Sequence, residues 1–301
     1  LPIEKLGAIA ELIKNGTKIF YLPPGQFEAT DDIDLENSIL FVDKGAKIDF
    51  WPLTNLKVGT LVVDGVAGED PVVLKKKDGL PGWNGITIVK GGYIKGANIM
   101  NVVNAGGAII GEDIDYVELK NTSFADVVSG ISVSNSKIDL ANLDFQGGIW
   151  AIRASNSSVK SDFVNCRDVD VCFSLEDDLA ILDHINAESL RAWAFEVIGP
   201  TSEINIGNVE IKNSSAILSM IGRPKVKYDF DKISDEDVRV KVIDQDIQSI
   251  YLNLWSKTSN EFFDKYKKFI DIRDGESENT FYMKKDPPVI KEDLIIPKNV
   301  N

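Results

Sequence analysis

The chain has 301 residues, of which 44% are hydrophobic and 27% charged, a composition typical of a globular protein and not of a disordered or fibrous one. Its 47 Asp and Glu residues against 33 Lys and Arg give a formal net charge of −14, which opposes binding to nucleic acid or to an anionic membrane, because both are polyanions. No run of about 18 apolar residues occurs, so we expect no insertion into a membrane.

The first predicted element is an amphipathic helix over residues 4–15, followed by Gly16 as a stop signal. Its apolar face consists of Leu6, Ile9, Ala10, Leu12 and Ile13. A strand is predicted at residues 18–22, and Pro23, Pro24 and Gly25 form a turn. We assign residues 1–25 to an N-terminal helix cap with the first strand. Because the chain begins Leu-Pro-Ile without an initiator Met or a signal-peptide pattern, we interpret it as a mature form or an excised domain.

An internal repeat fills the middle of the chain. Its apolar positions form columns that step by 21, 21, 21 and 24 residues, and two of these columns are offset by two residues, as expected for strands with one inward face. The first column is Val117, Ile138, Val159, Ala180 and Ile204, and the second is Leu119, Leu140, Ser161, Leu182 and Ile206. Short strand-like runs in stacked columns are typical of a parallel β-solenoid, which we expect over residues 26–222.

A polar column accompanies the apolar ones. It contains Asn98, Asn121, Asn142, Phe163, His184 and Asn208. Asn tolerates the left-handed backbone that a sharp corner between strands requires, and its amide can hydrogen-bond to the coils above and below. We therefore predict an asparagine ladder formed by the Asn residues of this column, with His184 as a structural corner residue within it.

Segments in the first part of the chain resemble a known family. The stretch AIAELIKNGTKIFYLPPGQF is similar to the capping helix and first strand of right-handed parallel β-helix proteins of the pectin-lyase-like superfamily, and KGAKIDF, LKVGTLVVDG and GWNGITI are similar to their opening coils. The resemblance covers about residues 4–222 and implies an all-β, right-handed parallel β-helix. It does not define the function, because this fold occurs in lyases, hydrolases, phage tailspikes, adhesins and passive binders.

The periodicity fades from residue 223, and we assign residues 223–301 to a C-terminal cap and tail, with a separate interaction module as the alternative. A helix is predicted there, with Ser259 or Asn260 as its N-cap. Its apolar face consists of Phe262, Phe263, Tyr266, Phe269 and Ile270. The two cysteines, Cys166 and Cys172, are too few for a disulfide-rich scaffold and leave the redox compartment open, and Cys166 falls in a column of buried apolar residues.

Catalytic patterns of the resembled family are incomplete in this chain. The family's galacturonan hydrolases use aspartates in NTD, DD and GHG patterns, but only the pair Asp177 and Asp178 matches, and it falls in a predicted loop. The family's pectate lyases place aspartates around calcium and use an Arg or Lys base. The outward positions Asp139, Lys160, Asp162 and Asp183 offer the nearest equivalent, because adjacent coils lie about 4.8 Å apart.

Stacked carboxylates repel each other, and such a pair either raises one pKa or attracts a cation such as calcium. The candidate metal ligands are therefore Asp139, Asp162 and Asp183, and the candidate catalytic residues are Asp162, Asp183 and Lys160. The simpler interpretation is a solvated face that Lys160 partly neutralises.

Aromatic residues outside the regular core columns are the candidate ligand-binding residues, because aromatic rings can stack on sugars. They are Trp51, Tyr93, Tyr228, Tyr251 and Trp255, and Trp83 also lies outside the columns. Trp150 and Trp193 share the parity of inward residues, so we predict that both lie in the core.

Three classes of function remain. We favour a non-catalytic, carbohydrate-binding adhesion module that is extracellular or at the cell surface, with cellulose or another plant polysaccharide as its partner, because the solenoid carries no complete catalytic set. A calcium-dependent polysaccharide lyase or hydrolase and a structural, phage or envelope fibre protein are the alternatives. On fold, size and lack of catalytic patterns, the chain also resembles the tāpirins, which are cell-surface cellulose-binding proteins with β-helical C-terminal modules.

We expect no cofactor, unless the stacked aspartates bind calcium, and the sequence leaves the oligomeric state open. Abundant Lys, Glu and Asp with 3 Met and 2 Cys are compatible with a thermophilic source, because hot environments favour charge networks and penalise labile residues.

Overall fold

The computed structural model describes residues 18–213, 218–221, 224–228, 233–234, 238–243, 250–254, 270–271 and 280–283. The chain divides into two compact units, Leu1–Arg153 and Ala154–Asn301. Every regular element in the described ranges is a strand, and none of these residues forms a helix long and apolar enough to span a bilayer. The structure is therefore all-β within the part of the chain that it describes.

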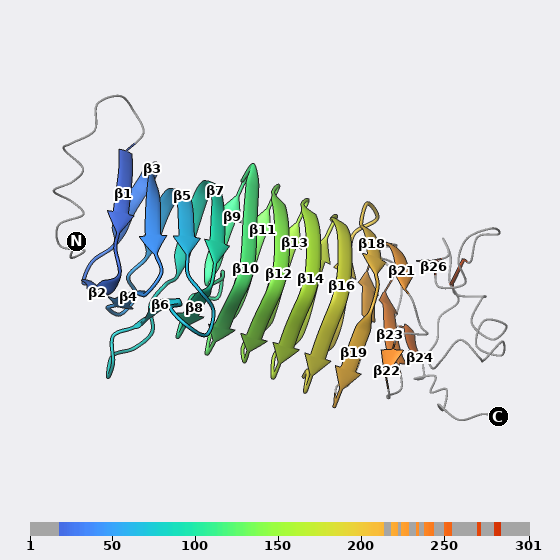
Figure 1. Cartoon of the computed structure of the whole chain (residues 1–301). Helices are drawn as coiled ribbons and strands as arrows, with labels where there is room; N and C mark the ends of the chain where they lie inside the picture. Colours follow the sequence, from blue (N-terminus) through green and yellow to red (C-terminus); the bar gives the residue numbers. More distant parts are fainter. Residues whose placement is uncertain are drawn as a thin grey trace. The chain divides into compact units, whose positions relative to one another are not determined.

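The first unit is a parallel β-solenoid (Figure 1). Its strands are β1 (Lys18–Leu22), β2 (Gly25–Ala29), β3 (Ile33–Asp43), β4 (Ala46–Phe50), β5 (Leu56–Asp64), β6 (Val72–Lys76), β7 (Ile86–Lys95), β8 (Ala97–Met100), β9 (Ile109–Glu112), β10 (Tyr116–Ala125), β11 (Ser129–Ser134) and β12 (Lys137–Gln146). One stack of parallel strands runs β1, β3, β5, β7, β10 and β12, and a second runs β2, β4, β6, β8 and β10. The strand β13 (Trp150–Ser155) contains the division between the units.

Alternation of apolar and polar residues explains why these segments form strands with one buried face. In β10 and β12 the residues at every second position are buried on either side of the corners at Asn121 and Asn142, and Leu119 pairs with Leu140 in register. Phe124 and Phe145 stack with ring centroids 4.6 Å apart, so like side chains repeat from coil to coil. Columns of stacked apolar side chains, one from each coil, thus fill the interior of this unit.

The second unit contains parallel coils followed by antiparallel strands. Its strands are β14 (Ser158–Arg167), β15 (Val171–Glu176), β16 (Leu179–Glu188), β17 (Trp193–Ile198), β18 (Glu203–Ile206), β19 (Val209–Lys212), β20 (Leu218–Ile221), β21 (Lys225–Tyr228), β22 (Ile233–Ser234), β23 (Val238–Ile243), β24 (Ile250–Leu254), β25 (Ile270–Asp271) and β26 (Thr280–Met283). Parallel pairing continues through β20 and β23, whereas β24 pairs with β23 and β26 pairs with β21 in antiparallel fashion.

The parallel register of these strands confirms the predicted parallel β-helix. Its coils are of the right-handed type. Parallel pairing extends past residue 222, since β21, β22 and β23 still pair with strands of the preceding coil. The predicted helix at residues 4–15 lies outside the described residues. The predicted C-terminal helix also lies outside them, except at Ile270, which belongs to the strand β25 and not to a helix.

The three tryptophans of the described interior and corners differ from the sequence-based expectation. Trp83 is fully buried and stacks on Phe50, with ring centroids 3.9 Å apart, so it belongs to the core although it lies outside the regular columns. Trp150 and Trp193 are only half-buried, and the guanidinium of Arg153 lies over the Trp150 ring. Each of these two residues begins its strand, where the inward parity no longer fixes burial.

Corners of the coils carry residues with positive φ. Asn121 has φ 50° and Asn142 has φ 57°, and Asn142 Nδ2 donates a hydrogen bond of 2.7 Å to Asn121 Oδ1. Asn98 has no positive φ and accepts a hydrogen bond from Ser123 Oγ at 2.8 Å. The amide stack in the first unit therefore joins Asn121 to Asn142.

Replacement of Asn142 by Ala is expected to lower the free energy of unfolding by about 1–2 kcal/mol, because the variant loses the amide bond to Asn121 and places a Cβ without polar compensation in the left-handed region. Asn142→Gly removes the same hydrogen bond but tolerates positive φ, so it should cost less than Asn142→Ala. Urea unfolding measures both, and equal stability of the wild type and Asn142→Ala would contradict the expectation.

The two cysteines form a disulfide between β14 and β15. Cys166 and Cys172 are bonded to each other, and neither side chain is exposed to solvent. Cys166 is therefore buried, as its column predicts, but it is a half-cystine and not a free thiol.

Candidate functional site

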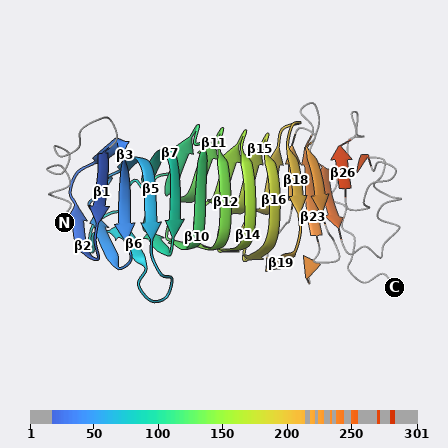
Figure 2. The same cartoon turned by 45° about the horizontal axis from the view of Figure 1, so that its top comes forward.

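An exposed aromatic row crosses four neighbouring strands of the first unit, β1, β3, β5 and β7, which Figure 2 shows side by side. Tyr21 pairs in register with Phe41, Phe41 with Val62, and Val62 with Tyr93. We call these four residues the aromatic row, in which Val62 is the one aliphatic member. Adjacent parallel strands lie about 4.8 Å apart, so the row extends about 14 Å across the sheet.

The row lies on the outer face because its members alternate with inward residues, although Gly92 beside Tyr93 is only half-buried. Tyr21 stands between Phe20 and Leu22, which are each only 1% exposed, whereas Tyr21 itself is 50% exposed. Phe41 is 38% exposed, and Val62 and Tyr93 are half-buried. This alternation places aromatic and aliphatic side chains on the outer surface at positions where polar residues are usual.

Charged and aliphatic residues border the aromatic row. On one side, Asp43 pairs in register with Asp64, and Asp64 pairs with Lys95. Tyr21 Oη donates a hydrogen bond of 2.7 Å to Asp43, which raises the pKa of Tyr21 and lowers that of Asp43. On the other side, Ile19 is 53% exposed. The row thus combines ring faces with carboxylates that can accept hydrogen bonds from hydroxyl groups.

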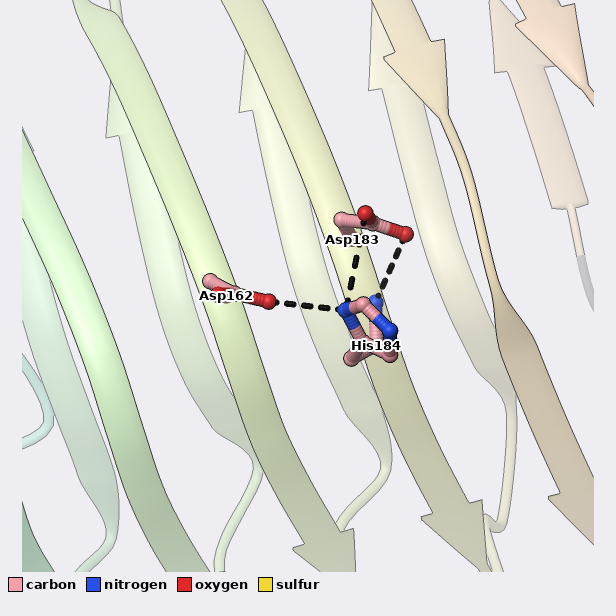
Figure 3. A group of neighbouring side chains, drawn as sticks. All are labelled: Asp162, Asp183 and His184. Carbon is pink, nitrogen blue, oxygen red and sulfur yellow. Dashed lines mark hydrogen bonds and ion pairs between the residues drawn. The ribbon is translucent and has the colours of Figure 1, made fainter.

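A second cluster, formed by Asp162, Asp183 and His184, lies on the second unit (Figure 3). Asp162 of β14 pairs in register with Asp183 of β16, as the outward column predicts. His184 Nδ1 lies 2.9 Å from Asp162 Oδ1 and 3.5 Å from Asp183 Oδ2. One potential ligand atom from each of the three residues lies within 4.8 Å of the others.

Neighbouring groups hold Asp183 in place. Burial acts to raise the pKa of Asp183, but hydrogen bonds outweigh it and keep this pKa below its ordinary value. The backbone N–H and the side-chain amide of Asn208 each donate to Asp183 Oδ1 at 2.8 Å, and the backbone N–H of His184 donates to the same oxygen at 3.0 Å. A side chain at position 207 would collide with this oxygen, so Gly207 permits the close approach.

His184 belongs to a strained corner as well as to the cluster. It has φ 49° and Phe163 has φ 54°, and their rings stack with centroids 4.4 Å apart. Phe163 is 50% exposed. Two carboxylates with an imidazole could hold a divalent transition metal ion, whereas calcium prefers oxygen ligands alone.

The remaining predicted site residues are dispersed. Lys160 is exposed and pairs in register with Ile181, and no ion pair of the described residues joins it to the cluster. Asp139 lies in the first unit, where it accepts a hydrogen bond of 2.8 Å from Tyr116 Oη, and burial with this bond raises the pKa of Tyr116 to about 12. Trp51 is 42% exposed at the end of β4.

Three of the predicted ligand-binding residues are not described at the level of side chains. Tyr228 belongs to β21 and Tyr251 to β24, but only their backbone is described. Trp255 lies outside the described residues.

Comparisons with known proteins give one finding. No model of a known protein family matches this chain, and no curated protein matches it. Among solved structures, the chain is similar to PfbA, a surface adhesin of Streptococcus pneumoniae, with a TM-score of 0.30 and 10% sequence identity over 80% of this chain and 84% of that chain. The parallel β-solenoid is therefore assigned from the strand register of this chain itself.

Sequence reasoning identified Tyr93 but missed Tyr21 and Phe41. The signal was present, because Tyr21 separates two apolar residues of the inward face and Phe41 does the same in the next coil. The first coils vary in length, so the columns of the regular repeat do not extend to them and the common row could not be aligned without the register.

Proposed function

We propose that this chain is a non-catalytic carbohydrate-binding module of a cell-surface adhesion protein, and that a neutral polysaccharide such as cellulose binds along the aromatic row. The observation that carries the proposal is the register that aligns Tyr21, Phe41, Val62 and Tyr93 on one exposed face. Such a face offers a sugar chain several stacking positions in one direction, with Asp43 and Asp64 beside it as hydrogen-bond acceptors.

Charge supports a neutral partner. The formal net charge of −14 disfavours polyanionic ligands such as pectin, because long-range repulsion slows their approach. The disulfide between Cys166 and Cys172 supports a location outside the reducing cytosol, since disulfides persist in oxidising compartments.

A pull-down with insoluble cellulose, xylan and pectin tests the proposal. We expect the wild type to bind an insoluble neutral glycan, and the triple variant Tyr21→Ala, Phe41→Ala and Tyr93→Ala to lose at least about tenfold in affinity, because stacking surfaces at the centre of a binding face dominate its energetics. The variant should remain folded, since all three side chains lie on the outer face.

Matched controls lie on the second unit. Leu179 and Ile181 are 58% and 57% exposed, so their replacement by Ala removes a comparable apolar surface and should leave binding unchanged. Asp183→Asn should also bind normally. Unaltered binding by the triple variant, or loss of binding in Asp183→Asn, would contradict the proposal.

The cluster of Asp162, Asp183 and His184 supports a second candidate, a metal-dependent polysaccharide lyase or hydrolase. Lyase products contain an unsaturated uronide that absorbs ultraviolet light, so incubation with pectin, with and without calcium or a divalent transition metal ion, gives a direct test. Product release that requires one of these metals and disappears in Asp183→Asn would replace the binding module with the enzyme.

A further inference from the structure

One oxygen of a covered carboxylate on the outer face of β4 lacks a hydrogen-bond donor. Asp49 lies between the inward residues Ile48 and Phe50, so its side chain is on the outer face, yet it is only 4% exposed. Gln26 Nε2 donates to Asp49 Oδ2 at 3.0 Å, but Asp49 Oδ1 has no hydrogen-bond partner. A buried acceptor without a donor is unfavourable, and native structures rarely retain one without a reason.

Lys75 forms a long ion pair with this oxygen. It pairs in register with Asp49 from the adjacent strand β6, and its Nζ lies 3.8 Å from Asp49 Oδ1, which is beyond hydrogen-bond distance. The ammonium group instead donates to Asp78 at 2.7 Å, and Asp78 is well exposed. A long, flexible lysine that is held on its solvent side can move away from Asp49 without losing its principal partner.

An exposed aromatic ring lies beside the same group. Glu28 pairs in register with Asp49 from β2, and Trp51 lies two residues beyond Asp49, at the end of β4. Lys77 forms an ion pair with Glu28 and lowers the pKa of that carboxyl group, and Trp51 adds to this lowering. Trp51 is 42% exposed, so part of its ring is open to solvent.

We propose that Trp51, Glu28 and Asp49 form a second sugar-binding subsite on the first unit, separate from the aromatic row, in which a sugar ring stacks on Trp51 and a hydroxyl group donates to Asp49 Oδ1 once Lys75 has moved aside. The inference rests on the proposed function for the class of ligand. The unpaired oxygen of Asp49 can accept a hydrogen bond, and the hydroxyl groups of a sugar are donors next to an apolar ring face.

Local charge favours the same class of ligand. Carboxylates of Glu28, Asp49 and Asp78 are interleaved with the ammonium groups of Lys75 and Lys77, and each lysine already has a carboxylate partner. The near balance of charge leaves little net attraction for either an anion or a metal cation. A neutral, hydroxyl-bearing ligand meets no such barrier.

Calorimetric titration with cellohexaose, and with xylohexaose in parallel, tests the subsite in the wild type, in Trp51→Ala, in Asp49→Asn and in the triple variant of the aromatic row. We expect the triple variant to retain a weaker binding event, and expect Trp51→Ala added to it to lower that affinity at least about tenfold. Asp49→Asn keeps the shape of the side chain but turns one acceptor into a donor, and should lower it comparably.

The outcomes separate this inference from the proposed function. If the wild type binds neither hexaose nor the insoluble glycans, the proposed function fails and the subsite fails with it. If the wild type binds but Trp51→Ala and Asp49→Asn, each added to the triple variant, leave its residual affinity unchanged, or the triple variant binds nothing, the subsite is overturned while the aromatic row stands. Since Trp51 is exposed, Trp51→Ala should fold and keep the test valid even if Asp49→Asn does not.

Discussion

Replacement of Asp178 by Ser is expected to remove most of the pH dependence of the free energy of unfolding between about pH 4 and pH 8. Asp178 is 0% exposed, and its carboxylate accepts the backbone N–H of Ser157 at 2.5 Å and that of Glu176 at 2.9 Å. Burial raises the pKa of Asp178 to about 7, the two N–H bonds oppose this in part, and the charges of Asp177 and Glu176 add to it.

The raised pKa of Asp178 means that stability falls as the pH rises. Between the ordinary value of 3.8 and the folded value of about 7, the folded protein binds a proton at Asp178 that the unfolded chain does not. Stability from this group is therefore fully present below about pH 4 and is lost as the pH rises through 7. The difference between pKa values of 3.8 and about 7 corresponds to about 4 kcal/mol of stability.

Serine is the natural replacement because the same corner carries Ser in other coils. Ser202 Oγ accepts the backbone N–H of Asp178 at 3.3 Å, and in the first unit Ser136 Oγ accepts the N–H of Ile114 at 3.0 Å. A hydroxyl group at position 178 can thus accept the N–H of Ser157 without a charge.

Urea unfolding at a series of pH values measures the effect as a difference between the wild type and Asp178→Ser. The free energy of unfolding of the variant minus that of the wild type should rise by about 4 kcal/mol between about pH 4 and pH 8, so the substitution is most favourable at high pH. Asp177→Asn, which keeps the shape of the neighbouring, half-buried side chain, serves as the control and should change the slope far less. Parallel pH profiles for the wild type and Asp178→Ser would refute the role of this carboxylate.

Asp178 also shows where sequence reasoning stops. The register of β10 with β12 and of β14 with β16 follows from repeating apolar columns, because a shift by one residue would expose every inward side chain. The column that contains Asp178 repeats a polar residue, and a polar residue at a corner gives no sign of whether water or a buried backbone N–H is its partner. The adjacent Asp177 and Asp178 therefore indicated a loop and not a buried charge.

The candidate sites were predicted only in part for a related reason. The contact between Asp162 and Asp183 follows from the step of 21 residues, since the regular coils fix which outward residues are neighbours. His184 joins that cluster because its ring points toward Asp162 from a corner with positive φ. The repeating columns of the sequence do not predict the direction of this ring. In the first coils the strand lengths vary, and β3 pairs with β5 through a register irregularity, so the alignment of Tyr21, Phe41 and Tyr93 required the structure.

Trp83→Ala is expected to lower the free energy of unfolding by about 3–5 kcal/mol, the usual cost of deleting a fully buried aromatic side chain. The ring has no exposed surface, lies nearly parallel to Phe50 with an interplanar angle of 5°, and its Nε1 donates to the carbonyl of Met100 at 2.8 Å. The variant loses the stacked pair, leaves a cavity beside Phe50 and removes the donor from the carbonyl of Met100.

Two further substitutions separate the contributions and connect stability with binding. Trp83→Phe keeps a ring against Phe50 but loses the bond to Met100, so its cost should lie between those of the wild type and Trp83→Ala. Trp51→Ala removes the same side chain from an exposed position and should change stability by less than about 1 kcal/mol. If urea unfolding showed Trp83→Ala to be as stable as Trp51→Ala, the burial of Trp83 would be wrong; the expected order instead places one tryptophan in the core and leaves the other available for a ligand.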